Sequence, residues 1–465
     1  MLTETLARET MQRELLGLLS VEQWTTLARK LGDFPPPDVA DFLDRLPEGQ
    51  RAILFRALPR SLASDVFAYL EPERQETLVH DLTGAEMREL LAALSPDDRT
   101  ALLAELPAVV TQRLLALLNS ADLAEARQLL GYAEDSVGRL MTPDLVAVRS
   151  DWTVARALAH IRAIGRDAET IDVIYVADER GFLLDDLRLR VLVLADPEGS
   201  VLSLMDGGYI ALRATDDREE VVRAMTHYDR TALPVVDSDG VLLGIVTVDD
   251  VLDVAEEEAT EDFQKLGGLE ALDLPYMQTG FLAMLRKRGG WLAALFLGEM
   301  LTATAMGYFE DEIAKAVVLA LFVPLIISSG GNSGSQATSL IIRAMALREV
   351  GLRDWWRILV RELPTGLALG AILGTIGAIR ILSWQAIGWA DYGTHAVLIA
   401  ATVGLSLIGV VLFGTLAGSL LPFALRRVGF DPASASAPFV ATLVDVSGLV
   451  IYFTVASVLL RGTLL

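Results

Sequence analysis

An acidic side chain stands alone in an apolar segment near the end of the chain. Asp445 carries the only charge between positions 438 and 460, and it follows Asp431 by fourteen residues. A continuous helix with a rise of about 1.5 Å per residue would place Asp445 about 21 Å beyond Asp431. An ionised carboxylate facing lipid at that depth would be costly. We therefore expect Asp445 to face an aqueous path, the alternative being a structural acid paired with a neighbouring helix.

The residues before Asp445 predict how this helix begins. Asp431 and Pro432 are typical of a helix start, as the N-cap and the first helical residue. Pro438 has no N–H, so it would leave the carbonyl of Ser434 free near one end of the span. The face that carries the acid comprises, at intervals of four and three residues, Ser434, Pro438, Ala441, Asp445 and Gly448.

A polar stripe runs along a second apolar segment and comprises Ser328, Asn332 and Gln336. A repeat of four gives one hydrogen-bonding face on a helix, which suits contact with the water shell of an ion. Gly331 lies beside the stripe and is a further candidate for lining a pore. Gly330 and Gly334 favour a competing interpretation, in which this segment only packs against another helix. Glu299, in the preceding apolar segment, is a candidate for the same path or its mouth.

The charge of the chain is divided unevenly. Before position 285 there are 26 Lys and Arg against 52 Asp and Glu, whereas the remainder has 13 against 10. The acidic part lacks the basic patches that phosphate contact needs, which argues against nucleic-acid binding and favours cations or a solvated surface. The chain has no Cys, and its four His show no zinc-site spacing. The N-terminal sequence does not resemble a signal peptide, so we expect the acidic part in the cytoplasm.

A repeat of short helices is predicted over residues 1–132. A leucine recurs every twelve residues from Leu46 to Leu118, often before Pro or another turn residue. Ser95-Pro96-Asp97-Asp98 illustrates a start, with a Ser cap, Pro at the first helical position and acids in the first turn. Units of this kind stack into a superhelix.

A β-rich pattern then occurs twice, over residues 133–200 and 201–254. Val137-Gly-Arg-Leu-Met141 is echoed by Val201-Leu-Ser-Leu-Met205, and Ile174-Tyr-Val-Ala-Asp178 by Leu233-Pro-Val-Val-Asp237. Each copy predicts a first strand, a helix and a hairpin with an acidic, glycine-containing turn. This pattern resembles a tandem pair of CBS domains, although Asp185 stands where the first copy would usually have Gly.

An acidic connecting helix, within 255–283, is expected to lead into a transmembrane part over 284–465. Five apolar segments there could each cross about 30 Å of hydrocarbon: 291–308, 316–335, 366–384, 397–421 and 438–460. Lys and Arg concentrate before the first, between the second and third, and between the fourth and fifth, which predicts a cytoplasmic N-terminus and an outside C-terminus. The predicted fold is multidomain: an all-α helical repeat, an α/β tandem CBS pair, an acidic connecting helix and a five-helix transmembrane domain.

Two motifs make a family resemblance specific. Pro324-Leu-Ile-Ile-Ser-Ser-Gly-Gly-Asn-Ser-Gly-Ser-Gln336 and Asp431-Pro-Ala-Ser-Ala-Ser-Ala-Pro-Phe-Val-Ala-Thr-Leu-Val-Asp445, in this domain order, resemble the MgtE family of magnesium channels. The resemblance covers essentially the whole chain. It implies a homodimer in the inner membrane, with a pore on the two-fold axis between the second and fifth helices of each subunit. It also implies that Asp445 and the carbonyl of Ala441 hold a hydrated Mg²⁺.

The same resemblance implies that cytoplasmic Mg²⁺ closes the pore by binding the acidic part. The implied ligands are Asp217, Asp229, Asp250, Asp253, Glu258, Glu261 and Asp262, to which the helical domain can add only Asp97 and Asp98. Bare carboxylates on facing domains would repel one another. Mg²⁺ prefers one or two carboxylates and retained waters, so it could bridge them. ATP stays open as a ligand of the CBS pair.

Other functions stay open at this level. A transporter of another divalent cation, such as Co²⁺ or Mn²⁺, would use the same residue types. A non-transporting membrane sensor would need neither Asp445 nor the polar stripe. An anion carrier would need a basic or helix-N-terminal site within the spans, and the sequence shows none. An enzyme would need a nucleophile paired with a base, and no catalytic residue is predicted.

Overall fold

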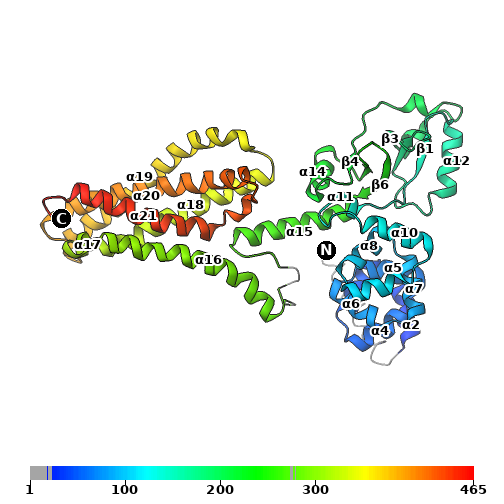
Figure 1. Cartoon of the computed structure of the whole chain (residues 1–465), viewed down its shortest axis with the longest axis horizontal. Helices are drawn as coiled ribbons and strands as arrows, with labels where there is room; N and C mark the ends of the chain where they lie inside the picture. Colours follow the sequence, from blue (N-terminus) through cyan, green and yellow to red (C-terminus); the bar gives the residue numbers. More distant parts are fainter. Residues whose placement is uncertain (1–17, 19–22, 273–275, 278, 465) are drawn as a thin grey trace. The chain divides into compact units, whose positions relative to one another are not determined.

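The chain folds into two compact units, Met1–Glu256 and Glu257–Leu465. The structure is a computed structural model that describes residues 18, 23–272, 276–277 and 279–464 (Figure 1). The predicted multidomain fold is confirmed, since a helical repeat, two small sheets and five apolar helices follow one another in the predicted order.

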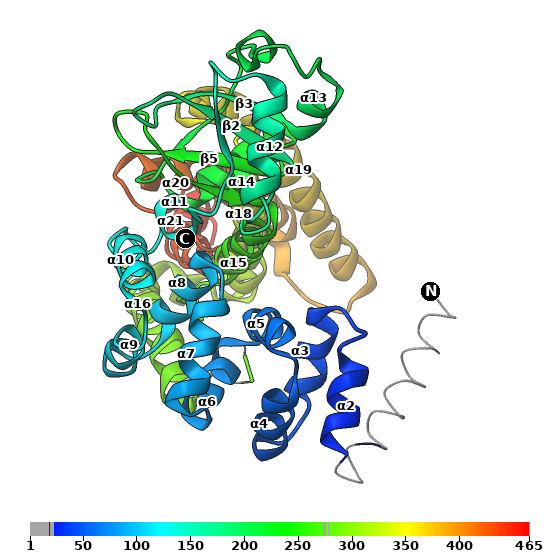
Figure 2. The same ribbon diagram turned by 90° about the vertical axis from the view of Figure 1, so that its right-hand side faces the viewer.

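Short helices form the first part of unit 1 and follow one another around a curved stack (Figure 2). Their bounds are α2 Trp24–Leu31, α3 Pro36–Asp44, α4 Glu48–Ala57, α5 Arg60–Ala68, α6 Pro72–Asp81, α7 Gly84–Ala93, α8 Pro96–Glu105, α9 Ala108–Leu115 and α10 Ser120–Leu129. The twelve-residue repeat is confirmed, because Leu58, Leu94 and Leu106 are buried and each directly follows a helix. The Ser95 hydroxyl caps α8 by accepting from the N–H of Asp98.

The CBS pair consists of two three-stranded sheets with the orders β1-β2-β3 and β4-β5-β6. In each sheet the first strand pairs parallel with the second, which pairs antiparallel with the third, as the two predicted copies require. The first copy comprises α11 Val137–Leu140, β1 Ala147–Arg149, α12 Val154–Ile164, β2 Val173–Ala177, β3 Leu183–Arg188 and α13 Leu189–Leu194. The second comprises the 3₁₀ turn η1 Val201–Leu204, β4 Leu212–Arg213, α14 Arg218–Tyr228, β5 Ala232–Val236 and β6 Leu242–Thr247.

The two copies and the helical repeat are joined within unit 1. The N–H of Leu183 donates to the Gly240 carbonyl at 3.1 Å, and the N–H of Leu242 donates to that of Gly181 at 2.9 Å. Leu129 of α10 belongs to the same apolar core as the second copy. The helical repeat therefore has a fixed attachment to the CBS pair at its last helix.

The acidic helix α15, Val248–Leu266, leaves the second CBS copy. It ends earlier than the predicted 255–283 segment, because Gly267 and Gly268 follow Leu266 and Gly268 has a positive φ of 74°. Gly tolerates this left-handed conformation, which stops a helix.

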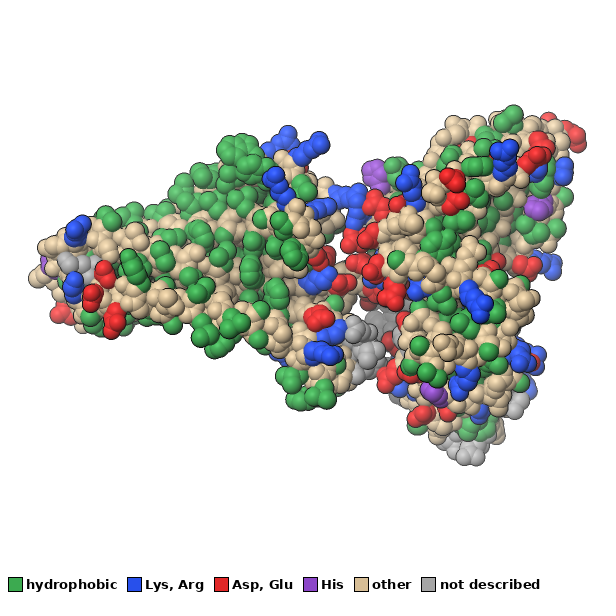
Figure 3. All heavy atoms as spheres, viewed as in Figure 1, with side chains coloured by type: hydrophobic (Ala, Val, Ile, Leu, Met, Phe, Trp, Pro, Cys, Tyr) green, Lys and Arg blue, Asp and Glu red, His purple; other side chains and the backbone are tan. Residues whose placement is uncertain are grey.

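The second unit contains five helices that are long and apolar enough to cross a membrane, among the described residues. Its elements are α16 Phe281–Tyr308, α17 Glu310–Lys315, η2 Val317–Phe322, α18 Val323–Ala346, η3 Leu352–Asp354, α19 Trp355–Ile387, η4 Gly393–His395, α20 Ala396–Arg427, η5 Pro432–Ser434 and α21 Ala437–Leu459. Several helices extend beyond the predicted apolar segments, because their ends continue into polar residues. In Figure 3 the charged side chains of this unit gather near its two ends, with apolar and uncharged side chains between them.

Helix α20 is the centre of the bundle, with α18, α19 and α21 packed against it. Glycines allow two of these contacts. Gly374 of α19 lies so close to α20 that a Cβ there would be 2.6 Å from the Gly404 carbonyl oxygen, and Gly330 of α18 meets Gly414 in the same way. Such close approach favours van der Waals packing in a membrane.

Candidate ion pathway and acidic domain contact

Helix α21 begins later than the sequence predicts. Ser436 is its N-cap and accepts from the N–H of Phe439 at 3.4 Å, whereas Asp431 caps the separate turn η5. Pro438 therefore lies in the first helical turn, where no carbonyl inside the helix loses a donor. The carbonyl of Ser434 therefore does not belong to α21, and Ser434 lies outside the helical face that carries Asp445.

Asp445 is eight residues from the start of α21, a depth of about 12 Å along the helix instead of about 21 Å. Its carboxyl group is partly exposed and lies near the carboxyl group of Glu299 on α16. The fold thus brings together two intramembrane acids that are 146 positions apart in the sequence.

The polar stripe of α18 lies on an open face of the single chain. Ser328, Asn332 and Gln336 are all exposed. Asn332 and Gln336 also line a groove of about 300 Å³, together with Ser329, Ser333, Leu369, Ile372, Leu373 and Val411. Gly330 and Gly334 lie on a different face of the helix and pack against α20. Helix packing therefore occupies one face of α18, and the polar stripe lies on another.

Other predicted lining residues lie between packed helices. Gly331 is buried, and a Cβ there would be 3.7 Å from the Cβ of Ala441 on α21. Gly448 is buried against α20, where a Cβ would be 3.1 Å from Cγ1 of Val410. Because glycine has no side chain, α18 and α20 can approach α21 closely at these two positions.

A second group of acids joins the helical repeat to the CBS pair inside unit 1. Asp97 and Asp98 lie in the first turn of α8, and Asp249 and Asp250 lie in that of α15. Asp97 is only 8 % exposed, and its Oδ1 has no hydrogen-bond partner. The hydroxyl of Thr247 donates to Oδ2 of Asp250 at 3.1 Å.

Burial and mutual repulsion make these carboxyl groups hard to ionise. Burial, with the charge of Asp97 next, raises the pKa of Asp98 to about 6, that of Glu169 to about 7 and that of Asp250 to about 9. Burial also raises the pKa of Asp97, against a hydrogen bond from Ser95. The charged groups that act most strongly on these four are all acids, among them Asp249. We call Asp97, Asp98, Glu169, Asp249 and Asp250 the cation-free group.

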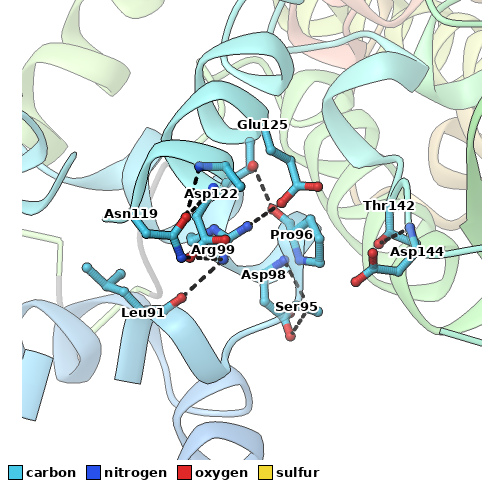
Figure 4. A network of polar contacts seen from close by, with 12 residues as sticks. Leu91, Ser95, Pro96, Asp98, Arg99, Asn119, Asp122, Glu125, Thr142 and Asp144 are labelled. Carbon is cyan, nitrogen blue, oxygen red and sulfur yellow. Dashed lines mark hydrogen bonds and ion pairs between the residues drawn. The ribbon is translucent and has the colours of Figure 1, made fainter. Parts of the chain in front are cut away.

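The next residue of α8, Arg99, is by contrast a buried cation that is bonded to acids. Its side chain is 4 % exposed and donates to the Leu91 carbonyl at 3.2 Å and to Glu125 at 2.5 Å, with Asp122 at 3.9 Å (Figure 4). Burial raises the pKa of Asp144 in the first CBS copy, and the charge of Arg99 works against that rise. Arg99 thus partly balances acids from both sides of the contact, and we call these residues the Arg99 group.

The other predicted sensor acids of unit 1 lie apart at exposed positions. Asp217 is the N-cap of α14 and accepts from the N–H of Glu219, whereas Asp229 ends that helix with a φ of 49°. Asp253 lies on the exposed side of α15, where its charge acts on Tyr69 of α5. Across the part of the chain that the structure describes, no three acidic or His side chains meet closely enough to coordinate a metal ion directly.

The predicted acids of unit 2 share a lysine. Lys265 donates to Oδ2 of Asp431 at 2.7 Å and also forms an ion pair with Glu261. Burial, and then the charge of Asp431, raises the pKa of Asp262, with Lys265 opposing and Glu258 adding to the rise. This part of α15 is therefore tied to the turn η5, which precedes α21.

Sequence reasoning missed Glu169, Asp249 and Arg99 as members of the domain contact. Glu169 joins the contact because its N–H donates to the Asp144 carbonyl at 2.8 Å, a long-range pairing with no sequence signal. Asp249 could have been found, because it directly precedes a predicted acid. Arg99 follows two predicted acids, but its burial depends on contacts with α7 and α10.

Five apolar helices with paired acids, attached to a helical repeat and a CBS pair, define a membrane transport protein with a large soluble part. Family models match residues 323–455 as the MgtE divalent cation transporter domain, 34–135 as the MgtE intracellular N domain and 201–257 as a CBS domain. The chain is 43 % identical to the magnesium transporter MgtE of Thermus thermophilus, covering 94 % of this chain and 95 % of that protein. The chain belongs to the MgtE family of divalent cation transporters, and it is a transporter and not an enzyme.

Other relatives agree with this assignment. The magnesium transporter MgtE of Bacillus subtilis is 31 % identical, covering 93 % of each chain. A crystal structure of the cytosolic domain of the Mg²⁺ channel MgtE in complex with ATP has 41 % identity and a TM-score of 0.50, and covers 52 % of this chain and 99 % of that one. The soluble part of a magnesium transporter has 29 % identity and a TM-score of 0.51, covering 54 % and 99 %.

Proposed function

We propose that this chain conducts Mg²⁺ across the inner membrane into the cytoplasm, as a homodimer whose N-terminus is cytoplasmic and whose C-terminus is outside. The observation that carries the proposal is the pair of intramembrane acids, Asp445 and Glu299, on α21 and α16. Charged groups at such positions are expensive and mark ion pathways. The exposed polar stripe of α18 would complete the lining, with Asp431 at the mouth.

The donors present fit a hydrated Mg²⁺. This ion gives up its waters reluctantly and is bound by one or two carboxylates. Asp445 supplies a carboxylate, the Ala441 carbonyl lies one helical turn before it, and Asn332 and Gln336 offer amides to the water shell. The names of the relatives favour Mg²⁺ over Co²⁺ or Mn²⁺ as the cargo.

Cytoplasmic Mg²⁺ is also the proposed regulator, through the cation-free group. Asp97 has a buried oxygen without a partner, and its neighbouring carboxyls repel one another, so a divalent cation would supply what the contact lacks. A hydrated ion could bridge Asp97 or Asp98 to Asp250 without three direct ligands. We propose that this bridging closes the pore, with the predicted acids of α14 and α15, Asp217, Asp229, Asp253, Glu258, Glu261 and Asp262, as further cation sites.

The proposed division of labour follows the predicted domains: a helical domain over 1–132, CBS copies over 133–200 and 201–254, a connecting segment over 255–283 and the pore domain over 284–465. ATP is a proposed second ligand of the CBS pair, because a 41 % identical cytosolic domain binds it. Asp185 supports the fold of the first copy, where its Oδ2 accepts from the N–H groups of Asp206 and Gly207 at 2.8 and 3.0 Å. The side chain thus has a role inside the protein.

Flux through purified protein in liposomes tests the pore. Asp445→Ala should abolish Mg²⁺ flux while the protein still inserts, and Glu299→Gln should change the ion selectivity or the rate. Within α18, Asn332→Ala should lower conductance more than Ser333→Ala, because Ser333 is buried and bonded to Thr415 at 2.7 Å. Flux of the Asp445→Ala protein at the parent rate would contradict the pathway, and faster flux of Co²⁺ or Mn²⁺ than of Mg²⁺ would reassign the cargo.

Flux at graded Mg²⁺ on the cytoplasmic face tests the sensor. The Asp250→Asn/Asp253→Asn protein should stay open at Mg²⁺ concentrations that close the parent, because the carboxylates that bridge the ion are gone. A normal closing curve would refute the sensor and leave the pore assignment intact.

A further inference from the structure

Arginines from three helices meet at one end of the membrane bundle. Ile341 and Met345 of α18, Ile358 of α19 and Phe423 of α20 share a small apolar core, which fixes these helix ends together. The exposed arginines around this core are Arg343, Arg353, Arg357, Arg361, Arg426 and Arg427. We call them the arginine belt.

The belt carries more positive charge than its own acids balance. Stretches 341–362 and 423–428 contain seven Arg against three acids, Glu349, Asp354 and Glu362. Asp354 pairs with Arg357 at 3.1 Å and also accepts from the N–H of Gly351. Within the described part of the chain, Arg353 has no ion-pair partner, and the charge of Arg361 acts on the partly buried Glu362 next to it. An anionic ligand would therefore meet guanidinium groups with free donors.

The level of the belt along α19 matches that of lipid headgroups. Residues 363–379 carry no charge, so Glu362 and Arg380 are separated by about 27 Å of helix. This length is close to that of a bilayer's hydrocarbon core, about 30 Å. The helix before Glu362 then lies among the headgroups, and Trp355 and Trp356, both exposed, are residues that favour this interface.

We propose that the belt binds an anionic phospholipid, with the phosphate held by Arg353, Arg357 and Arg361. Arg357 and Arg361 are one helical turn apart and lie on one face, which Arg353 approaches from the preceding turn. Guanidinium groups hold phosphate oxygens with paired hydrogen bonds. The acyl chains lie along exposed apolar side chains that continue down α19 from the same end: Val360, Leu363 and Leu367.

The other end of α19 also carries Trp and exposed apolar side chains, but it lacks the cluster of arginines. Arg380 stands alone there and stacks on Trp384, with its guanidinium carbon 3.9 Å from the ring centroid. A soluble phosphate could bind the guanidinium groups but would not contact the exposed apolar side chains further along α19. Charge and apolar surface together favour a lipid.

The test is lipid binding by the full-length protein, purified in a neutral detergent. Native mass spectrometry would count bound phosphatidylglycerol, with phosphatidylcholine of the same chain length and inorganic phosphate as comparison ligands. Each arginine near an anionic headgroup contributes about fivefold to binding. The Arg353→Gln/Arg357→Gln/Arg361→Gln protein should therefore bind phosphatidylglycerol about a hundredfold more weakly. The control Arg380→Gln should stay within about twofold of the parent.

Each alternative result overturns the proposal in its own way. Equal binding by the triple variant and the parent would remove the site. Equal binding of phosphatidylcholine would leave only apolar contact, and displacement of phosphatidylglycerol by equimolar inorganic phosphate would assign the site to a soluble anion. Substitution of the three positions by Lys, which keeps the charge, checks that lost binding does not reflect misfolding, because that variant should regain most of the affinity. This experiment does not measure ion flux, so its result is independent of whether the proposed function is correct.

Discussion

The helical repeat meets the CBS pair through two groups of acids, and only one of them contains a cation of the protein itself. The Arg99 group has its own cation, buried and bonded to acids of α10, with Asp144 of the first CBS copy within its influence. The cation-free group has none among the charges that act most strongly on it. The two begin on adjacent residues of α8, Asp98 and Arg99. Under the proposed function, the first contact needs no external cation, whereas the second depends on one.

The difference also separates stability from regulation. A buried ion pair is costly to break because the remaining partner keeps its charge in a poor solvent. A cluster of like charges is costly as long as it stays ionised, and either a proton or a divalent cation relieves it. Breaking the first group should lower stability whatever the Mg²⁺ concentration, whereas changing the second should alter the response to Mg²⁺.

The largest expected effect comes from Arg99→Gln. The change leaves Glu125, Asp122 and Asp144 without their cation and should destabilise unit 1 by about 3–5 kcal/mol, with or without Mg²⁺. Thermal unfolding of the purified full-length chain measures this. Arg60→Gln is the matched control, because Arg60 is 85 % exposed in its pair with Glu89 and should lose at most about 1 kcal/mol. Equal losses in the two variants would mean that Arg99 does not hold the contact together.

A smaller effect is expected when the cation-free group receives its own cation. Asp249→Lys places an ammonium group beside Asp97, Asp98 and Asp250 on an exposed side chain, so the fold should tolerate it. The domains should then stay together without Mg²⁺, and the Mg²⁺ needed for half of any remaining response should rise about tenfold, the equivalent of about one pKa unit. Because the chain has no Cys, dyes on Val109→Cys and Ser238→Cys can report the contact by energy transfer.

The matched control for that experiment is Asp239→Lys, which makes the same change in net charge in the hairpin turn of the second CBS copy. It should titrate with Mg²⁺ as the parent does. If both variants lost the response equally, general charge would be the cause, and the distinction between the two groups would fail.

Much of the fold could be predicted because its signals are local. The leucine repeat, the two CBS copies and five apolar segments all follow from spacing, and the structure confirms them. The start of α21 could not be placed, because both Asp431 and Ser436 are good caps, and the choice depends on tertiary contacts such as the bond from Trp291 to Ser436 at 3.3 Å. The pairing of Glu299 with Asp445, and of Glu169 with Asp97, joins residues far apart in sequence, which only packing can bring together.

The smallest expected effect is a dependence of the domain contact on pH in the absence of Mg²⁺. Separated Asp and Glu side chains titrate near about 4, whereas burial raises the pKa of Asp98 to about 6, that of Glu169 to about 7 and that of Asp250 to about 9. Groups whose pKa is higher in the contact stabilise it below about pH 4, and this stabilisation is lost as pH rises through 6, 7 and 9. Lowering the pH from 8 to 5.5 should therefore strengthen the contact by protonating Asp98 and Glu169.

Mg²⁺ should remove this dependence, because a proton and a bridging cation relieve the same repulsion and compete for the same oxygens. Energy transfer between the two dyes should rise as the pH falls in a chelator, and should stay high and flat at saturating Mg²⁺. Three side chains on neighbouring elements interact with the cation-free group and also affect its pH profile: Asp65, Tyr69 and Asp144. Asp98→Asn should flatten the lower part of the profile, whereas Asp122→Asn, in the Arg99 group, should leave it unchanged. A profile that fell with acid, or that persisted at saturating Mg²⁺, would show that the two groups do not differ in the way their cations suggest.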